Sequence, residues 1–190
     1  MEKEDNKKLE ELEKLRELSF KKYNISLSLD SYEDIFSDFD PRPFSEKALS
    51  VDFLEEAERA SRDKVSGAIE LNLLVPKNKR SSSKEKVIRR RLRDHFKKHL
   101  EMLKKEKMEI IRRGIIFFVF GIIFMFLGAY IHFSWEDSIF TSFLIVILEP
   151  AGWFSFWEGL RQIIFDSKQI NPKLEFYKKM HECVINFNSY

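Results

Sequence analysis

The sequence predicts a mostly helical membrane protein. The expected fold has a two-helix transmembrane hairpin, a small cytosolic α+β region with two short strands, and a long basic helix continuous with the first span. Three observations lead to this prediction. Residues 115–133 read IIFFVFGIIFMFLGAYIHF and contain no Asp, Glu, Lys or Arg. A second apolar stretch covers residues 139–165. Segments 24–29 and 67–75 are rich in the Ile, Leu and Val that fit a half-buried strand.

The first apolar segment has the length of a membrane span. Its nineteen residues make roughly 28 Å of helix at about 1.5 Å per residue, close to the ~30 Å hydrocarbon core of a bilayer. Only residues 134–138 connect it to the second stretch, which forces the two spans into an antiparallel hairpin. The chain begins MEKEDNKKLEELEKL, without the apolar core of a cleavable signal peptide. We therefore expect the first span to act as its own insertion signal.

Basic residues flank the hairpin on one side only. The connection 134–138 reads SWEDS and has no Lys or Arg, whereas Arg161, Lys168 and Lys173 lie at or after the end of the second span. The positive-inside rule predicts a multi-pass protein of the cell membrane with both termini in the cytoplasm. Five basic residues before the first span are expected to contact anionic lipid headgroups: Lys104, Lys105, Lys107, Arg112 and Arg113.

Composition divides the chain into five parts. They are a charged N-terminal helix at 1–22, a small cytosolic α+β region with a linker at 23–83, a basic amphipathic helix at 84–113, the hairpin at 114–165, and a cytosolic C-terminal tail at 166–190. In the first part, a leucine every three residues forms a narrow helical stripe. Both a solvated helix and a short coiled-coil contact with another copy fit this stripe.

The α+β region is expected to contain the two strands and a helix at 51–62. Ser31 is placed to cap a helix start, with Asp34 reaching back to it. Two strands alone make a poor sheet. Either they pair and are covered by the helices, or an edge pairs with another subunit.

Acidic and aromatic residues alternate in the segment SYEDIFSDFDPRPF, residues 31–44. Caps, turns and solvated surface can explain the acids, and a divalent-cation site lacks the glycine and ligand spacing of an EF-hand loop. The interleaved phenylalanines favour docking onto a basic partner surface. The residues of this possible docking loop are Asp34, Phe36, Asp38, Phe39, Asp40 and Arg42.

Charge is distributed unevenly along the chain. Residues 1–63 hold 18 acidic and 11 basic side chains, whereas residues 77–113 hold 16 basic and 5 acidic ones. Lipid contact with membrane insertion is the favoured role of the basic helix. Pairing with the acidic region, within or between subunits, is an alternative. Nucleic-acid binding is unlikely, because no helix-turn-helix or aromatic platform accompanies the basic run.

Metal, cofactor and catalytic signals are weak. Cys183 is the only cysteine, which excludes an internal disulfide and a Cys-rich zinc site. His95 and His99 have a spacing that can hold zinc, but no third ligand lies at a suitable position. No nucleophile–base pair or phosphate-binding loop is visible. We therefore expect no metal, no cofactor and no enzymatic activity, and the sequence leaves open whether the chain binds a small molecule.

Glycines recur every seven residues in the first span. Gly114, Gly121 and Gly128 lie on one face, where small residues let membrane helices approach closely. This face is expected to meet the second span or a neighbouring subunit. Because Ala has the better helix propensity, Ala at position 114 is expected to be tolerated, whereas Leu at position 121 should disturb the packing.

Glu149 is an ionisable residue inside the second apolar stretch, eleven residues from its start and therefore roughly 15 Å deep. An ionisable group at such depth suggests function. Three roles are open for Glu149. It is a protonated, hydrogen-bonded packing residue, it belongs to an ion or proton path, or it contacts water because the second half of the segment lies in the membrane interface. Pro150 and Gly152 are expected to kink or break the helix. Glu158 and Arg161 are expected to pair near the inner interface.

Two blocks carry a resemblance: SYEDIFSDFDPRPFSEKALSVDFLEE and ILEPAGWFSFWEGL. Over about residues 24–178, the chain resembles a family of small prokaryotic membrane proteins with no assigned activity. The resemblance implies a shared architecture, a cytosolic strand–helix region followed by a membrane hairpin, and no functional residue.

Together these features favour a membrane-anchored, non-enzymatic scaffold or interaction protein that acts as a homo-oligomer on the cytoplasmic face. The alternative is a small oligomeric ion channel or proton-linked pore that uses Glu149. The oligomeric state discriminates between them, because a dimer of hairpins supplies only four spans.

Overall fold

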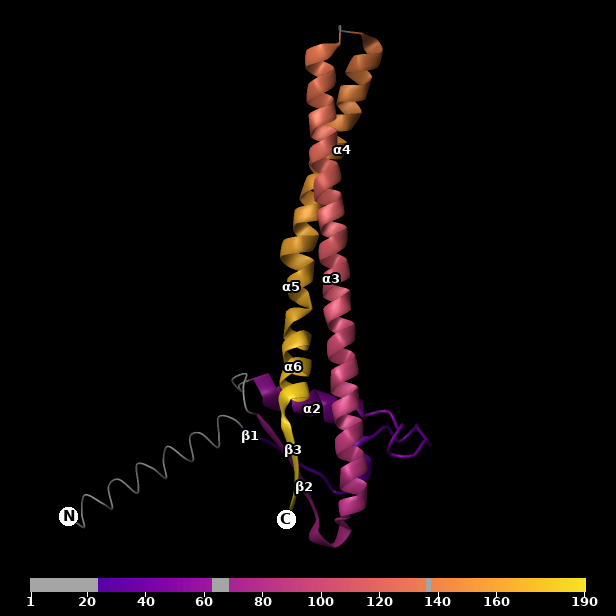
Figure 1. Cartoon of the computed structure of the whole chain (residues 1–190), viewed down its shortest axis with the longest axis vertical. Helices are drawn as coiled ribbons and strands as arrows, with labels where there is room; N and C mark the ends of the chain where they lie inside the picture. The colour runs from indigo at the N-terminus through magenta and orange to yellow at the C-terminus, as the bar shows by residue number, and fades with distance from the viewer. Residues whose placement is uncertain (1–23, 63–68, 136–137) are drawn as a thin grey trace, which may run out of the picture. The chain divides into compact units, whose positions relative to one another are not determined.

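The computed structural model describes residues 24–62, 69–135 and 138–190. The chain forms two compact units (Figure 1). Unit 1 comprises the residues up to Leu100 together with Glu175–Tyr190, and unit 2 comprises Glu101–Leu174. The predicted helix at 1–22 lies outside the described residues.

Unit 1 contains a three-stranded parallel sheet in the order β1-β2-β3. The strands are β1 (Asn24–Ser28), β2 (Glu70–Val75) and β3 (Val184–Ser189). The prediction of only two strands is wrong, because β3 comes from the segment expected to be a tail. Parallel strands need long crossover connections. The second crossover holds every helical element from α3 to α6, so β3 lies 109 residues after the end of β2 in sequence.

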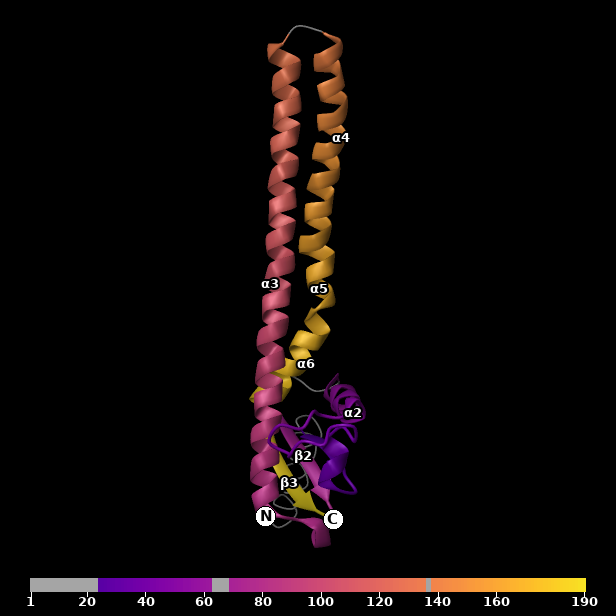
Figure 2. The same ribbon diagram turned by 90° about the vertical axis from the view of Figure 1, so that its right-hand side faces the viewer.

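Helices cover one face of this sheet. Ile25, Leu71 and Ile185 are neighbours in register and point into a common core. Three helices supply the opposite wall: α2 (Val51–Arg62), α3 (Ser82–Ser134) and α6 (Asn171–Glu182). Figure 2 shows β2 and β3 beside α3 and α2. The core side chains of these helices are Phe53, Ala57, Ile88, Leu92, Phe96, Phe176 and Met180.

The other face of the sheet carries Ser and Asn side chains together with Leu74 and Val184, and Asn72 in the central strand is buried. Asn72 lies beside Asn186 in register, and the Asn188 side-chain amide donates to the Asn72 side-chain oxygen at 3.2 Å. Ser26 and Ser28 of β1 are exposed on this face. The sequence alternation in β1 therefore separates a buried face from a wet one.

The chain after β1 begins with a capping box. The Ser31 hydroxyl accepts from the Glu33 amide at 3.2 Å, and the Asp34 carboxylate accepts from the Ser31 amide at 3.0 Å. The predicted cap is confirmed, although it starts only the short 3₁₀ helix η1 (Tyr32–Ile35). Tyr32 and Ile35 are buried, so this turn anchors the segment to the core.

Unit 2 is built on two helices that run antiparallel. Helix α3 is one helix through Gly114, as predicted. Helix α4 (Ile139–Arg161) has Ser138 as its N-cap, and the Ser138 hydroxyl accepts from the Thr141 amide at 3.2 Å. By length and composition, both helices qualify as candidate membrane spans. Few side chains in their apolar windows are buried inside the protein.

Helix α4 continues through Pro150 instead of breaking there. The irregular turn lies further on, in the π-helical η3 (Gln162–Asp166), which the short α5 (Ser167–Gln169) follows. The interfacial half-helix considered for the second apolar stretch is therefore not the conformation of this chain.

Candidate functional sites

The glycines of α3 lie against glycines of α4 in unit 2. A Cβ added at Gly121 would be 2.4 Å from the Phe156 amide nitrogen and 2.8 Å from the Gly152 carbonyl oxygen. A Cβ at Gly159 would be 2.6 Å from the Gly114 carbonyl oxygen. The two backbones therefore touch directly at these levels, which only residues without a side chain allow.

Gly114 and Gly128 differ in their surroundings. A Cβ at Gly114 would be 2.7 Å from Ile163 Cγ1 and 3.0 Å from the Gly159 carbonyl oxygen. The expectation that Ala is tolerated at position 114 stays a prediction, and this geometry argues against it, because an added methyl would contact Ile163 of η3 and the Gly159 carbonyl oxygen of α4. At Gly128 the nearest atoms, Leu148 Cβ and Glu149 Cγ, are 3.7 and 3.8 Å away, an ordinary contact.

Glu149 lines an open groove between α3 and α4. The groove has a volume of about 670 Å³, and His132 of α3 lines it as well. In the part of the chain that the structure describes, neither side chain makes a hydrogen bond or an ion pair. The remaining lining is apolar: Met125, Ala129, Phe133, Pro150 and Trp153.

Glu158 and Arg161 form the ion pair that their spacing predicted. Arg161 Nη2 lies 2.8 Å from Glu158 Oε1, and Arg161 Nη1 lies 2.9 Å from Asp166 Oδ1. The Gln162 side-chain amide also donates to Glu158 Oε1 at 2.8 Å. This network bridges the end of α4 and the π turn, so its charges are already paired within one chain.

The basic residues before the first span are not equivalent. Lys107 donates to the Asn171 side-chain oxygen at 2.7 Å and is half-buried. The side chains of Lys104, Lys105, Arg112 and Arg113 are exposed. Four of the five predicted headgroup contacts are thus available to a ligand outside the chain.

Most of the predicted docking loop is occupied by its own contacts. Asp40 accepts from Arg42 Nη2 at 2.7 Å and from the Ala48 amide at 2.6 Å, and the Arg42 bond holds the pKa of Asp40 well below its usual range. Phe36 is buried and stacks on Phe44. Asp34 caps η1. Asp38 and Phe39, which is 97% exposed, point outward, so the free surface of the loop is smaller than its composition suggests.

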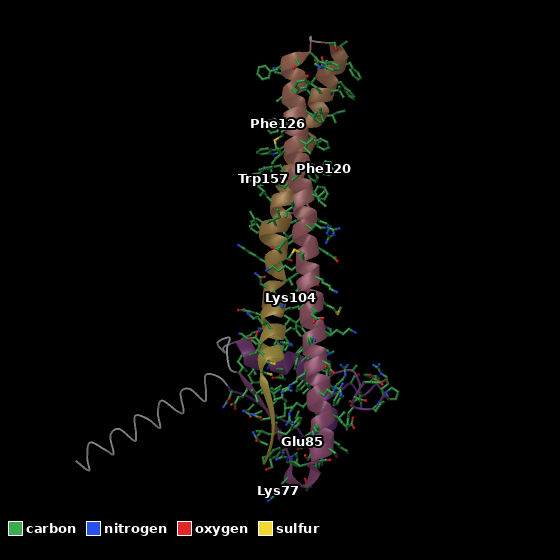
Figure 3. All side chains as sticks on the ribbon, in the orientation of Figure 1. Lys77, Glu85, Lys104, Phe120, Phe126 and Trp157 are labelled. Carbon is green, nitrogen blue, oxygen red and sulfur yellow. The ribbon has the colours of Figure 1, made fainter. Side chains whose placement is uncertain are left out.

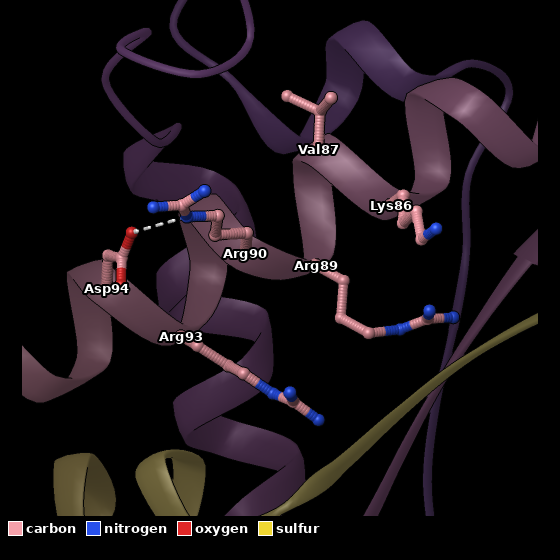
Figure 4. Close-up of a pocket in the computed structure, with 6 residues that line it drawn as sticks. All are labelled: Lys86, Val87, Arg89, Arg90, Arg93 and Asp94. Atoms are coloured by element: carbon pink, nitrogen blue, oxygen red, sulfur yellow. Dashed lines mark ion pairs between the residues drawn. The ribbon is translucent and has the colours of Figure 1, made fainter.

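A basic groove of about 590 Å³ runs along α3 in unit 1 (Figure 4). Arg89 is fixed there, because its Nε donates to the Ile185 carbonyl oxygen at 3.0 Å and its guanidinium lies over the Phe187 ring. Arg90 Nε lies 3.9 Å from Asp94 Oδ2. Lys86 and Arg93 have no ion pair among the described residues.

The ion pairs of the described residues stay within each charged region. The acidic region pairs Lys47 with Glu33 and the α2 arginines with α2 glutamates. The basic region pairs Arg80 with Glu85. The described ion pairs therefore give no intramolecular pairing between the acidic region and the basic helix.

Sequence reasoning missed a buried polar cluster at the start of α3. The Tyr32 hydroxyl donates to Glu85 at 2.8 Å, and Arg80 donates to both Glu85 oxygens at 2.9 and 3.1 Å. The Arg80 bonds lower the pKa of Glu85, so this nearly buried carboxylate stays charged. The partners are 53 and 5 residues from Glu85 in sequence, and no local pattern joins Tyr32 to it.

His95 and His99 take part in an aromatic stack with Tyr177 of α6. The ring centroids of the two histidines are 4.2 Å apart, and those of His99 and Tyr177 are 5.2 Å apart. Burial lowers the pKa of His95 to about 4. Among the described residues, no group of three or more His, Cys, Asp or Glu side chains is placed to hold a metal ion.

Comparison of this chain with protein-family models, with curated proteins and with solved structures finds no match. The resemblance to small prokaryotic membrane proteins therefore stays a prediction.

Proposed function

We propose that this chain is anchored in the cell membrane by the α3–α4 hairpin and acts as a homo-oligomeric scaffold or interaction protein on the cytoplasmic face. The observation that carries the proposal is the outward surface of unit 2. Phe126 is 73% exposed, Phe133 90% and Trp153 59%. Figure 3 shows the side chains along both helices, with Phe120, Phe126 and Trp157 labelled. Apolar exposure on this scale fits lipid tails better than water.

The distribution of basic residues supports the orientation. Lys104, Lys105, Arg112 and Arg113 are exposed on α3 before its apolar segment, and residues 134–138 carry no Lys or Arg. With both termini in the cytoplasm, these side chains reach the leaflet that is rich in anionic lipids. Each basic residue near that surface contributes about 1 kcal/mol of attraction.

Unit 1 then supplies the contact surface. One face of its sheet exposes Ser26, Ser28 and Val184 of the outer strands. Its docking loop presents Phe39, and its basic groove holds Lys86 and Arg93 without ion pairs among the described residues. Such surfaces suit binding, and we assign the chain a non-enzymatic role for that reason.

Reporter fusions test the topology. A reporter after Tyr190 should give a cytoplasmic signal, and one inserted at Glu136 should give an external signal. Signals from the same side would exclude the hairpin. The mass of the protein in detergent, measured by light scattering with the detergent contribution subtracted, tests the oligomer. A strictly monomeric protein would remove the homo-oligomeric part of the proposal.

A small pore is the second candidate, because Glu149 and His132 share a groove within apolar helices. Ion or proton passage needs several hairpins around an axis. Liposome flux assays decide this candidate, with Glu149→Gln as the matched variant that keeps size and hydrogen-bonding capacity. Flux above empty liposomes that Glu149→Gln abolishes would favour the pore over the scaffold. Equal flux from protein-loaded and empty liposomes would exclude it.

A further inference from the structure

We infer that a second copy of this chain docks in the groove between α3 and α4, forming a two-fold dimer in which Glu149 of each copy hydrogen-bonds with His132 of the other. The inference rests on the membrane-anchored homo-oligomer proposed above and names its contact surface. Hereafter the 670 Å³ groove lined by His132 and Glu149 is called the Glu149 groove.

The Glu149 groove contains an ionisable side chain at a position where a surface that faces lipid should be apolar. Ten residues of α4 precede Glu149, from Ile139 to Leu148, and none of them is charged. An ionisable side chain among lipid tails is unfavourable by a few kcal/mol, on the order of 2.5–3.5 on insertion scales. Glu149 is exposed and makes no hydrogen bond within the described part of its own chain. A lipid tail cannot form a hydrogen bond with the Glu149 carboxyl group, so the molecule that fills the groove must supply a polar group.

The register of the hairpin places the Glu149 side chain near the level of Gly128, because a Cβ added at Gly128 would be 3.8 Å from Glu149 Cγ. His132 is four residues beyond Gly128 on α3, so about 6 Å of helix separates its backbone from that level.

The side-chain directions bring Glu149 and His132 toward one level. In a helix the Cα–Cβ bond tilts toward the N-terminus. Because α3 and α4 are antiparallel, Glu149 leans toward the 134–138 connection, and His132 leans away from it. In a two-fold dimer with its axis along the membrane normal, positions at one level face each other across the axis. Each carboxyl can therefore reach the imidazole of the other copy, and the contact is self-complementary.

The lining of the groove suits a second hairpin. Ala129 is small and exposed between Met125 and Phe133, so it permits close approach of another helix. The glycine face of α3 is already occupied by α4, because Gly121 and Gly114 lie against the α4 backbone. The Glu149 groove supplies the complementary acid and base, and a second copy supplies both partners at once.

Cysteine cross-linking tests the contact in the full-length protein. In a Cys183→Ser background, Ala129→Cys places one thiol in the groove. The matched control is Leu127→Cys, two residues away on another exposed face of the same helix. Oxidation with a membrane-permeant copper complex in native membranes should give a covalent dimer for Ala129→Cys and none for Leu127→Cys.

Paired substitutions test the hydrogen bond. Glu149→Leu and His132→Leu should each raise the dimer dissociation constant roughly tenfold, since two equivalent bonds are lost per dimer. The double variant should be no weaker than either single one, because both remove the same bond. Glu149→Gln keeps a hydrogen-bond donor and should retain most of the dimer. It therefore still tests the contact if the Glu149→Leu protein does not fold.

The outcomes separate this inference from the proposed function. If the protein is oligomeric in detergent but Ala129→Cys gives no covalent dimer, the inferred contact is overturned and the proposed scaffold function stands. Equal yields of covalent dimer from Ala129→Cys and Leu127→Cys would mean non-specific collision and would also overturn it. Additive effects of the two leucine substitutions would exclude the Glu149–His132 bond. A monomer in every assay would remove both proposals.

Discussion

Gly121 and Gly128 lie on the same face of α3, but a side chain added at each would meet different surroundings. At Gly121 an added Cβ meets the α4 backbone at 2.4 Å, whereas at Gly128 it meets side-chain atoms at 3.7 Å or more. Backbone atoms cannot move aside as a flexible side chain can, so the helices would have to separate. Small-residue contacts between helices therefore have to be judged one position at a time.

We predict that Gly121→Ala destabilises the hairpin by about 1–3 kcal/mol, the usual range for overpacking, and that Gly121→Leu is worse. Gly128→Ala is the matched control and should change stability by less than about 0.5 kcal/mol. Thermal melting in detergent and the yield of folded protein measure both. Equal melting of Gly121→Ala and the wild type would contradict direct backbone contact.

Gly114→Ala is predicted to reduce stability by about 1 kcal/mol despite its better helix propensity. The added methyl would lie 2.7 Å from Ile163 Cγ1 and 3.0 Å from the Gly159 carbonyl oxygen. Ile163→Ala in the same chain should recover part of the loss by making room. A variant more stable than the wild type would show that α4 can retreat without penalty.

His95 makes unit 1 sensitive to acid. Its imidazole lies against His99, Tyr177 and Phe96, and Arg91 and Lys98 nearby add to the effect of burial. The folded pKa of His95 is lowered to about 4 from its usual 6.5. The folded state therefore favours the neutral ring, and its stabilisation is complete above about pH 6.5 and is lost as the pH falls toward 4.

Because His95 is only half-buried, solvent reduces the full linkage value, and we expect a loss of about 1–2 kcal/mol between pH 6.5 and pH 4. His95→Gln should flatten this part of the profile, while His181→Gln, on an exposed site, should leave it unchanged. Melting temperatures at several pH values give the comparison. A His95→Gln profile as steep as that of the wild type would assign the acid sensitivity to other groups.

At the scale of elements, β3 is the strand that completes unit 1. Ile185 and Phe187 are buried in the core, and the Phe187 ring meets Tyr32 edge-on at 5.9 Å. Even-numbered residues bond to β2, as the bond from the Val184 amide to the Ile69 carbonyl shows. The Ile185 carbonyl therefore faces the outer edge, where Arg89 caps it.

Phe187→Ala should destabilise unit 1 by about 3 kcal/mol, because it removes a large buried side chain. Val184→Thr is the matched control on the wet face of β3 and should have an effect within about 0.5 kcal/mol. Hydrogen exchange of the β2 amides reports the loss directly. Unchanged protection in Phe187→Ala would mean that β3 adds little to the core.

At the scale of the whole molecule, we expect the flanking charges to set the orientation of the proposed membrane hairpin. The four exposed basic residues before the apolar segment of α3 have no counterpart in residues 134–138. Neutralising Lys104, Lys105, Arg112 and Arg113 with Gln should reduce the orientation bias. Reporters at both ends should then give mixed signals.

Lysine substitution in the connection is the complementary change. Trp135→Lys with Asp137→Lys should retain the connection in the cytoplasm in a fraction of the molecules once the four basic residues are neutralised. If the variant with all six substitutions keeps the single topology of the wild type, the sequence of unit 1 before the hairpin sets the orientation, and the flanking charge does not.

The sequence by itself determined the features that depend on neighbours along the chain. Apolar runs indicated two long helices, and the short connection made them antiparallel. Period-two alternation indicated β1, a run rich in Ile, Leu and Val indicated β2, and Ser31 with Asp34 indicated the cap. Glu158 and Arg161 pair as expected because a spacing of three residues brings side chains together on any helix.

Only the tertiary structure decided which distant residues meet. The segment VINFNS alternates as β1 does, but no neighbouring segment offers it a partner strand, and it becomes β3 because β2 offers it an edge 109 residues earlier in sequence. His132 and Glu149 share a groove, and Gly114 lies against Ile163 and Gly159, because of the register in which the two antiparallel segments pack. Local patterns fix the shape of an element, whereas register and partner choice depend on side-chain volumes across a contact, which no single segment encodes.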